Sequence, residues 1–130
     1  MILGALEAGG TKMVCAIGNE QGKIYKRISI ATETPDKTLP AIIRFFREQG
    51  VEALGIGCFG PIDLKRTSPT YGYITTTPKQ AWKNCDIVGI FKKELEIPIG
   101  FDTDVNGSAL GEATWGAAQG LENSIYITIG

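Results

Sequence analysis

The order of apolar segments and turn residues is the feature that most constrains how this chain can fold. Three short apolar segments open the sequence, at residues 2–8, 13–18 and 23–31. Gly9-Gly10 separates the first two, and residues 19–22, which contain asparagine and glycine, separate the second from the third. Because glycine and asparagine favour tight turns, the three segments are predicted to form an antiparallel meander.

A helix is predicted after the meander. Residues 38–49 carry apolar side chains at helical spacing, and Gly50 follows as a stop signal. The start is placed at Thr38 because Pro40 then falls in the first turn, where its missing N–H is not needed. The apolar residues 51–59 then predict a buried strand that ends at Gly60-Pro61.

The second half of the chain alternates between helix and strand patterns after a long polar loop at residues 62–84. Long loops inside a compact domain are usually functional. The expected elements that follow are a helix at 86–95, a strand at 97–102, a helix at 104–119 ended by Gly120 and a strand at 124–129. The predicted fold class is therefore α/β, with a mixed sheet that begins with three antiparallel strands and with helices packed on it.

Composition excludes several classes of partner. The chain has 130 residues, the size of one domain, and a formal net charge of −1 without a basic stripe, so no nucleic-acid partner is expected. No apolar run approaches the roughly 20 residues that cross a bilayer, so no membrane partner is expected either. Cys15, Cys58 and Cys85 are too few and scattered for a disulfide framework, which predicts a reduced, cytoplasmic setting.

The first segment that could bind a ligand or take part in catalysis is residues 6–12. It is an acidic strand end followed by Gly9, Gly10, Thr11 and Lys12. Glycines let backbone N–H groups approach phosphate oxygens without a Cβ in the way. The spacing fits neither a Walker loop nor a dinucleotide fingerprint. A tight hairpin turn without a ligand is the alternative interpretation.

The second segment is residues 101–106, where a strand meets the start of a helix. Asp102 and Asp104 are two apart, and ligands of α/β sheets gather at the carboxyl ends of strands, so one carboxylate could serve as a general base. The alternative is that Thr103 or Asp104 only caps the helix.

The third segment combines a glycine-rich strand end at residues 55–63 with the polar run at 75–79 and Trp82. Backbone groups and hydroxyls there could surround a polyol, and the indole could cover a sugar face. The alternative is that Gly60-Pro61 is a turn and Trp82 belongs to the core.

Taken in this order, the three segments resemble the sugar kinases of the ROK family, within the actin-like ATPase superfamily, over essentially the whole chain. Residues 101–106 and 58–63 are similar to the fructokinase branch. The resemblance implies a ribonuclease H-like fold and assigns residues 1–130 to the amino-terminal kinase lobe. Thr128-Ile129-Gly130 resembles the start of the family's second phosphate motif, so the carboxy-terminal lobe is expected beyond Gly130.

The resemblance also implies a nucleotide site. Gly9, Gly10, Thr11 and Lys12 would bind the phosphates of ATP, and Glu7 would help to hold Mg²⁺ through water. The family's zinc ligands would lie in the missing lobe, as would the surface through which such kinases often form homodimers.

Asp104 falls on the position of the family's catalytic aspartate, and Gly60, Pro61 and Thr77 on segments that line the sugar side of the cleft. The implied activity is ATP-dependent phosphorylation of a hexose, with fructose to fructose 6-phosphate as the expected reaction. Glucose, mannose or an amino sugar stays open as the substrate. The rival hypotheses are a sugar-responsive regulator and a sugar-binding domain without catalysis.

Overall fold

The computed structural model describes residues 1–115 and 119–121. Its elements are β1 (Leu3–Ala8), β2 (Lys12–Gly18), β3 (Ile24–Ala31), α1 (Pro35–Gln49), β4 (Ala53–Cys58), η1 (Gln80–Trp82), α2 (Ile87–Leu95), β5 (Ile99–Thr103) and α3 (Asp104–Trp115). The predicted elements are confirmed in type and order up to α3, with boundaries that shift by a few residues. The strand expected at 124–129 and the end of the helix expected at 104–119 lie outside the described residues.

The five strands form one sheet in the order β3-β2-β1-β4-β5. β1 pairs antiparallel with β2, and β2 pairs antiparallel with β3, as the predicted meander requires. β4 then pairs parallel with β1, and β5 pairs parallel with β4. The mixed sheet is therefore confirmed, and its parallel half directs the ends of β1, β4 and β5 to the same edge.

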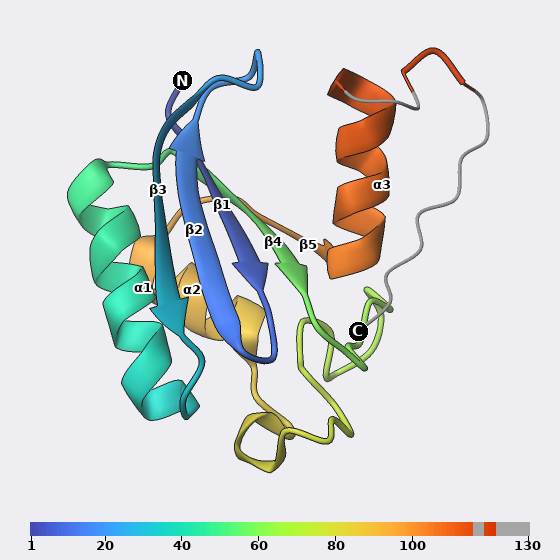
Figure 1. The fold of residues 1–130 in the computed structure, drawn as a ribbon. Coiled ribbons are helices and arrows are strands. Elements are labelled where there is room, and N and C mark those ends of the chain that lie inside the picture. The colour runs from blue at the N-terminus through green and yellow to red at the C-terminus, as the bar shows by residue number, and fades with distance from the viewer. Residues whose placement is uncertain (116–118, 122–130) are drawn as a thin grey trace.

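Alternation along the strands separates a core face from an outer face. Leu6 and Ala8 are buried on the core face, whereas Ala5 and Glu7 are exposed on the other. Helices α1 and α2 lie on one side of the sheet and α3 lies on the opposite side, next to β4 and β5 (Figure 1). The hydrophobic core thus fills the space between the sheet and the α1–α2 layer.

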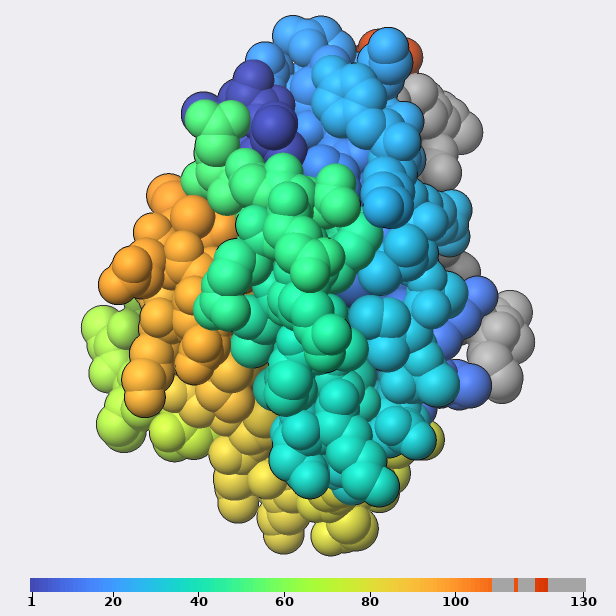
Figure 2. All heavy atoms as spheres, turned by 90° about the vertical axis from the view of Figure 1, so that its left-hand side faces the viewer, coloured from blue at the N-terminus to red at the C-terminus, as the bar shows by residue number. Residues whose placement is uncertain are grey.

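Helix α1 closes most of this core. Its apolar face buries five large side chains against the sheet: Leu39, Ile42, Ile43, Phe45 and Phe46. Figure 2 shows α1 on the outside of the molecule, between α2 and β3. Gly50, with a φ of 66°, ends the helix in the left-handed conformation and donates its N–H to the carbonyl of Arg47.

The predicted start of α1 is wrong by three residues. The helix begins at Pro35 rather than at Thr38, and Pro40 lies inside it. Proline is favoured at the first helical position, and Pro35 takes that place directly after the N-cap residue Thr34. Pro40 then removes one helical hydrogen bond on an exposed side, which the burial of the apolar face offsets.

None of the helices in the described part of the chain is long and apolar enough to span a membrane.

Helix α2 depends on its N-cap. The Oδ1 of Asp86 accepts a hydrogen bond of 2.9 Å from the Gly89 N–H. We expect Asp86→Ala to lower the free energy of unfolding by about 1 kcal/mol, because that donor loses its partner. Asp86→Asn is the matched control and should retain most of the stability, since asparagine caps equally well. Urea denaturation of the three chains checks this, and equal losses in both variants would contradict the capping role.

Two core thiols predict a loss of stability in alkali. Burial raises the pKa of Cys15 and of Cys58 to about 12, so both stay neutral in the fold while the unfolded chain ionises them from about pH 9.0. The unfolded state therefore binds fewer protons, and the free energy of unfolding should fall as the pH rises from 9 towards 12. Denaturation across this range measures the slope, and Cys15→Ala should reduce it. An unchanged slope in that variant would show that other groups cause it.

Candidate functional site

The candidate site lies where the parallel strands end. Glu7 on β1 pairs with Gly57 on β4, and Gly57 pairs with Asp102 on β5, so the three residues form one row across the sheet. Ligands of α/β sheets bind at this edge because helices and loops open outward from it. The row brings the acidic ends of the first and second predicted segments to the same side of the sheet.

Gly57 in the middle of this row lies close to the start of α3. A Cβ placed on Gly57 would lie 3.5 Å from the Cα of Asp104, the first residue of α3, which is an ordinary van der Waals contact. Glu7, Asp102 and Asp104 line the same cavity, of about 660 Å³, which extends between the sheet and α3.

The glycine turn between β1 and β2 is tightly built. The Gly9 N–H donates to the Lys12 carbonyl over 3.1 Å, and a Cβ on Gly9 would come within 2.6 Å of that carbonyl oxygen, which excludes other residues there. The hydroxyl of Thr32 donates to the Gly9 carbonyl at 2.8 Å, and the Thr32 N–H donates to the Thr11 carbonyl at 2.9 Å. Thr32, which follows β3, therefore holds the turn in place from the side.

The tip of the turn presents backbone donors. The N–H groups of Gly10 and Thr11 have no acceptor among the residues that the structure describes. Lys12 follows as an exposed cation at the start of β2. Unpaired backbone N–H groups in a turn form a concave site for anions, so the turn fits the phosphates of a nucleotide.

Three side chains at the junction between β5 and α3 accept hydrogen bonds from different donors. The Oγ1 of Thr103 accepts the Asn106 N–H at 3.1 Å and so caps the helix, while the Oδ1 of Asp102 accepts the Asn106 side-chain amide at 2.8 Å. The Oδ1 of Asp104 accepts the N–H of Val105 at 2.9 Å. Within the described residues Oδ2 of Asp104 has no partner, so this oxygen is available to a ligand.

Cys58 lies close beneath this carboxylate. Its pKa is raised mainly by burial, and the negative charge of Asp104 and the neighbouring Cys85 raise it further. The thiol therefore stays protonated near neutral pH.

The segment after β4 continues beside the end of β1. The Phe59 N–H donates to the Ala8 carbonyl at 2.9 Å, which places Gly60 and Pro61 directly beside the end of β1. Pro61 receives two hydrogen bonds at its carbonyl, from the N–H of Thr75 at 2.8 Å and from its hydroxyl at 3.1 Å. Gly60 and Pro61 therefore follow a residue paired with the end of β1, and Thr75 holds the Pro61 carbonyl.

Thr77 lies behind this surface. It is only 2% exposed, and its Oγ1 accepts the Lys79 N–H at 3.2 Å. This hydrogen bond shapes the loop, and the sugar contact that the resemblance implies for Thr77 stays a prediction.

The hypothesis that Trp82 covers a sugar face is wrong. Trp82 is 1% exposed, its ring packs edge-on against Phe59 at 6.1 Å, and its Nε1 donates to the Glu33 carbonyl at 2.8 Å. The alternative interpretation, a core position, is confirmed. The buried position is favoured over an exposed one because the indole gains a large apolar contact and a partner for its N–H.

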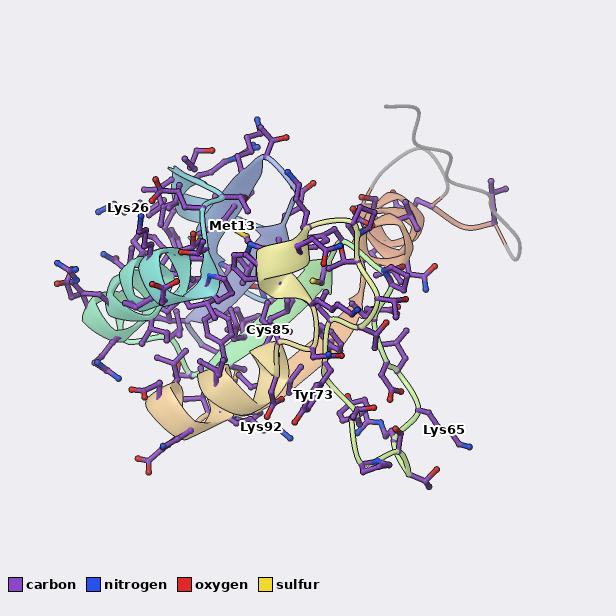
Figure 3. The ribbon with its side chains drawn as sticks, turned by 90° about the horizontal axis from the view of Figure 1, so that it is seen from below. Met13, Lys26, Lys65, Tyr73, Cys85 and Lys92 are labelled. Carbon is purple, nitrogen blue, oxygen red and sulfur yellow. The ribbon has the colours of Figure 1, made fainter. Side chains whose placement is uncertain are left out.

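The loop beyond Pro61 is organised by Asp63, which the sequence analysis did not single out for this role. Its Oδ2 accepts hydrogen bonds of 2.6 Å from the hydroxyls of both Ser68 and Thr70, and these bonds hold the pKa of Asp63 below its usual value. Figure 3 shows Lys65 at the outer end of this loop, pointing away from the fold. A single aspartate followed by Ser and Thr within seven residues was the available signal.

The side chains near the glycine turn can be compared with the ligands that Mg²⁺ requires. The described residues contain no group of three or more His, Cys, Asp or Glu side chains that could hold a metal. Mg²⁺ in phosphoryl-transfer sites is bound by one or two carboxylates, waters and the substrate phosphates, so the isolated Glu7 carboxylate near the glycine turn fits it. A zinc site, which the resemblance places beyond Gly130, lies outside the described residues.

Comparison with known proteins gives a consistent result. A family model described as "ROK family" matches residues 3–130. The chain is 52% identical to a fructokinase of Pediococcus pentosaceus over 130 residues, which cover 100% of this chain and 45% of that protein. It is also 52% identical to a fructokinase of Lactococcus lactis over 127 residues, 98% of this chain and 43% of that protein.

A solved structure shows the same fold. The crystal structure of a ROK family glucokinase from Streptomyces griseus, in complex with glucose and AMPPNP, superposes with a TM-score of 0.78 at 28% identity, covering 92% of this chain and 38% of that chain. The chain thus has the actin-like ATPase fold and spans less than half the length of the relatives it matches. Since the family model covers nearly every residue, this chain belongs to the ROK family.

Proposed function

We propose that the complete protein transfers phosphate from ATP to a hexose, with fructose converted to fructose 6-phosphate, and that this chain is its amino-terminal lobe. The single observation that carries the proposal is the Oδ2 of Asp104, a carboxylate oxygen without a partner in the described residues, in the cavity that Glu7 also lines. Two fructokinases at 52% identity support the substrate class. A carboxy-terminal lobe supplies the rest of the site.

Asp104 acts as the general base in this proposal. The hydroxyl on carbon 6 of the sugar gives its proton to the Asp104 carboxylate, and its oxygen forms a bond to the γ-phosphorus of ATP. The bond from that phosphorus to the bridging oxygen breaks, and ADP leaves with the electron pair. Such a transfer needs mainly positioning and charge neutralisation, so few protein groups suffice.

The glycine turn holds the nucleotide. Gly9 shapes the turn, Gly10 and Thr11 direct their N–H groups to phosphate oxygens, and Lys12 adds positive charge. Glu7 would help to hold Mg²⁺ through water, and the ion would neutralise negative charge on the nucleotide phosphates.

Gly60 and Pro61 contact the sugar from the loop after β4, where Thr75 holds the Pro61 carbonyl, and Thr77 lies in the same sugar-side loop. The reduced thiols fit a cytoplasmic enzyme, and a homodimer formed through the missing lobe is part of the same proposal.

Replacement of the proposed base tests the mechanism. In the complete protein, Asp104→Asn should lower kcat by about 10²–10⁴-fold, because the amide cannot accept the hydroxyl proton. Fructose binding, measured by calorimetry, should stay largely unchanged. Asp36→Asn on α1 is the matched control and should retain full turnover, because Asp36 lies on the far side of the sheet. Near-normal turnover of the Asp104 variant would refute the assignment.

The isolated chain tests the division into lobes. We expect the purified 130-residue chain to bind ATP weakly and to phosphorylate fructose at a negligible rate, because closure between two lobes normally excludes water and completes such a site. A coupled assay for ADP release measures this. Robust turnover would show that the site is complete without a second lobe.

A further inference from the structure

A lysine from a distant loop lies against the glycine turn. A Cβ built on Gly10 would lie 3.2 Å from the Cε of Lys79, the one heavy atom of the described residues within 4 Å of that position apart from those of residues 9–11. The Cε of Lys79 thus packs against the position that the Cβ of any other residue at position 10 would occupy. The turn and the loop are far apart in sequence, so tertiary contacts create this neighbourhood.

The backbone of Lys79 is held firmly. The Trp82 N–H donates to the Lys79 carbonyl at 2.8 Å, and the Lys79 N–H donates to the hydroxyl of buried Thr77 at 3.2 Å. The buried indole of Trp82 fixes the loop further through its bond to the Glu33 carbonyl. Lys79 is an exposed residue, and these hydrogen bonds fix the position from which its side chain extends.

One short segment joins the loop and the turn. Thr32 bonds the glycine turn through its hydroxyl and N–H, and its neighbour Glu33 bonds Trp82 through its carbonyl. Thr32, Glu33, Lys79 and Trp82 also line one small cavity of about 140 Å³. The position of Lys79 relative to the turn therefore depends on two adjacent residues after β3.

The ammonium of Lys79 is available to an anion. The ion pairs among the described residues join the Met1 amino group to Glu20 and Arg47 to Glu94, and neither uses Lys79. Among the described residues, the carboxylate of Glu33 makes no ion pair with Lys79. At the same place the Gly10 and Thr11 N–H groups lack acceptors within the described part of the chain. A cation and two N–H donors without partners therefore adjoin each other.

We propose that Lys79 binds the terminal phosphate of the nucleotide at the glycine turn. This inference rests on the proposed kinase function and adds a catalytic residue to it. Lysine binds phosphate as a mobile point charge, and a cation on the γ-phosphate stabilises charge as the phosphoryl group moves to the sugar. Gly10 has a second role in this arrangement, because its lack of a side chain leaves room for the Cε of Lys79 beside the turn.

The test uses the complete protein with Lys79→Met, which keeps the length of the side chain and removes its charge. Lys79→Arg keeps the charge, and Lys83→Met is the matched control, an exposed lysine four residues further along. Calorimetry measures the binding of AMPPNP, ADP and fructose to each, and steady-state assays measure kcat. Thermal unfolding confirms that each variant is folded, and Lys79→Gln replaces Lys79→Met if that variant is not.

We expect Lys79→Met to weaken AMPPNP binding by about 10- to 100-fold, the effect of losing one hydrogen bond to a charged group. ADP and fructose binding should change little, because neither contains the terminal phosphate. The kcat should fall by about 10²–10³-fold. Lys79→Arg should recover part of both losses, and Lys83→Met should match the unmodified protein.

Two results would overturn the inference while leaving the kinase proposal intact. One is unchanged AMPPNP affinity and turnover in Lys79→Met. The other is an equal loss of AMPPNP and ADP affinity, which would assign Lys79 to the shape of the turn or to an inner phosphate. If the unmodified complete protein neither binds AMPPNP nor phosphorylates any hexose, the proposed function fails, and the role of Lys79 fails with it.

Discussion

The parallel pairing of β1, β4 and β5 is the constraint on which the rest of the structure depends. It ends all three strands at one edge of the sheet and aligns Glu7, Gly57 and Asp102 in a single row. A shift of one residue in either pairing would turn an acidic side chain towards the apolar core. The start of α3 lies close to Gly57 in this row, and Asp104 lines the same cavity as Glu7 and Asp102.

The loops at this edge take their shape from a few buried polar contacts. Thr32 holds the glycine turn, and the Glu33 carbonyl holds the indole of Trp82, so one short segment positions two different walls of the site. Trp82 is buried away from any ligand, yet its N–H holds the carbonyl of Lys79, whose side chain lies beside the turn. A residue with no exposed surface can therefore matter for function through the rigidity it confers.

The junction of β5 and α3 illustrates how capping and chemistry share a short sequence. Thr103 caps the helix and Asp102 binds the Asn106 amide, which leaves one oxygen of Asp104 free of structural duties in the described residues. The pattern of residues 101–106 left open whether a carboxylate serves as a general base or whether Thr103 or Asp104 only caps the helix. The hydrogen bonds identify Thr103 as the cap, because its Oγ1 accepts an N–H three residues further along. The role of Asp104 as a base stays a prediction.

The sequence by itself determined the order of strands and helices, the antiparallel meander and the positions of the glycine turn and the acidic strand ends, because these depend on local periodicity and turn chemistry. It misplaced the start of α1, where two prolines competed for the first turn. Only the tertiary structure decided that Trp82 is buried, that Thr77 faces the loop interior and that Lys79 lies across Gly10. These outcomes depend on contacts between segments far apart in the chain, whose strength is set by packing and hydrogen-bond partners that no local pattern encodes.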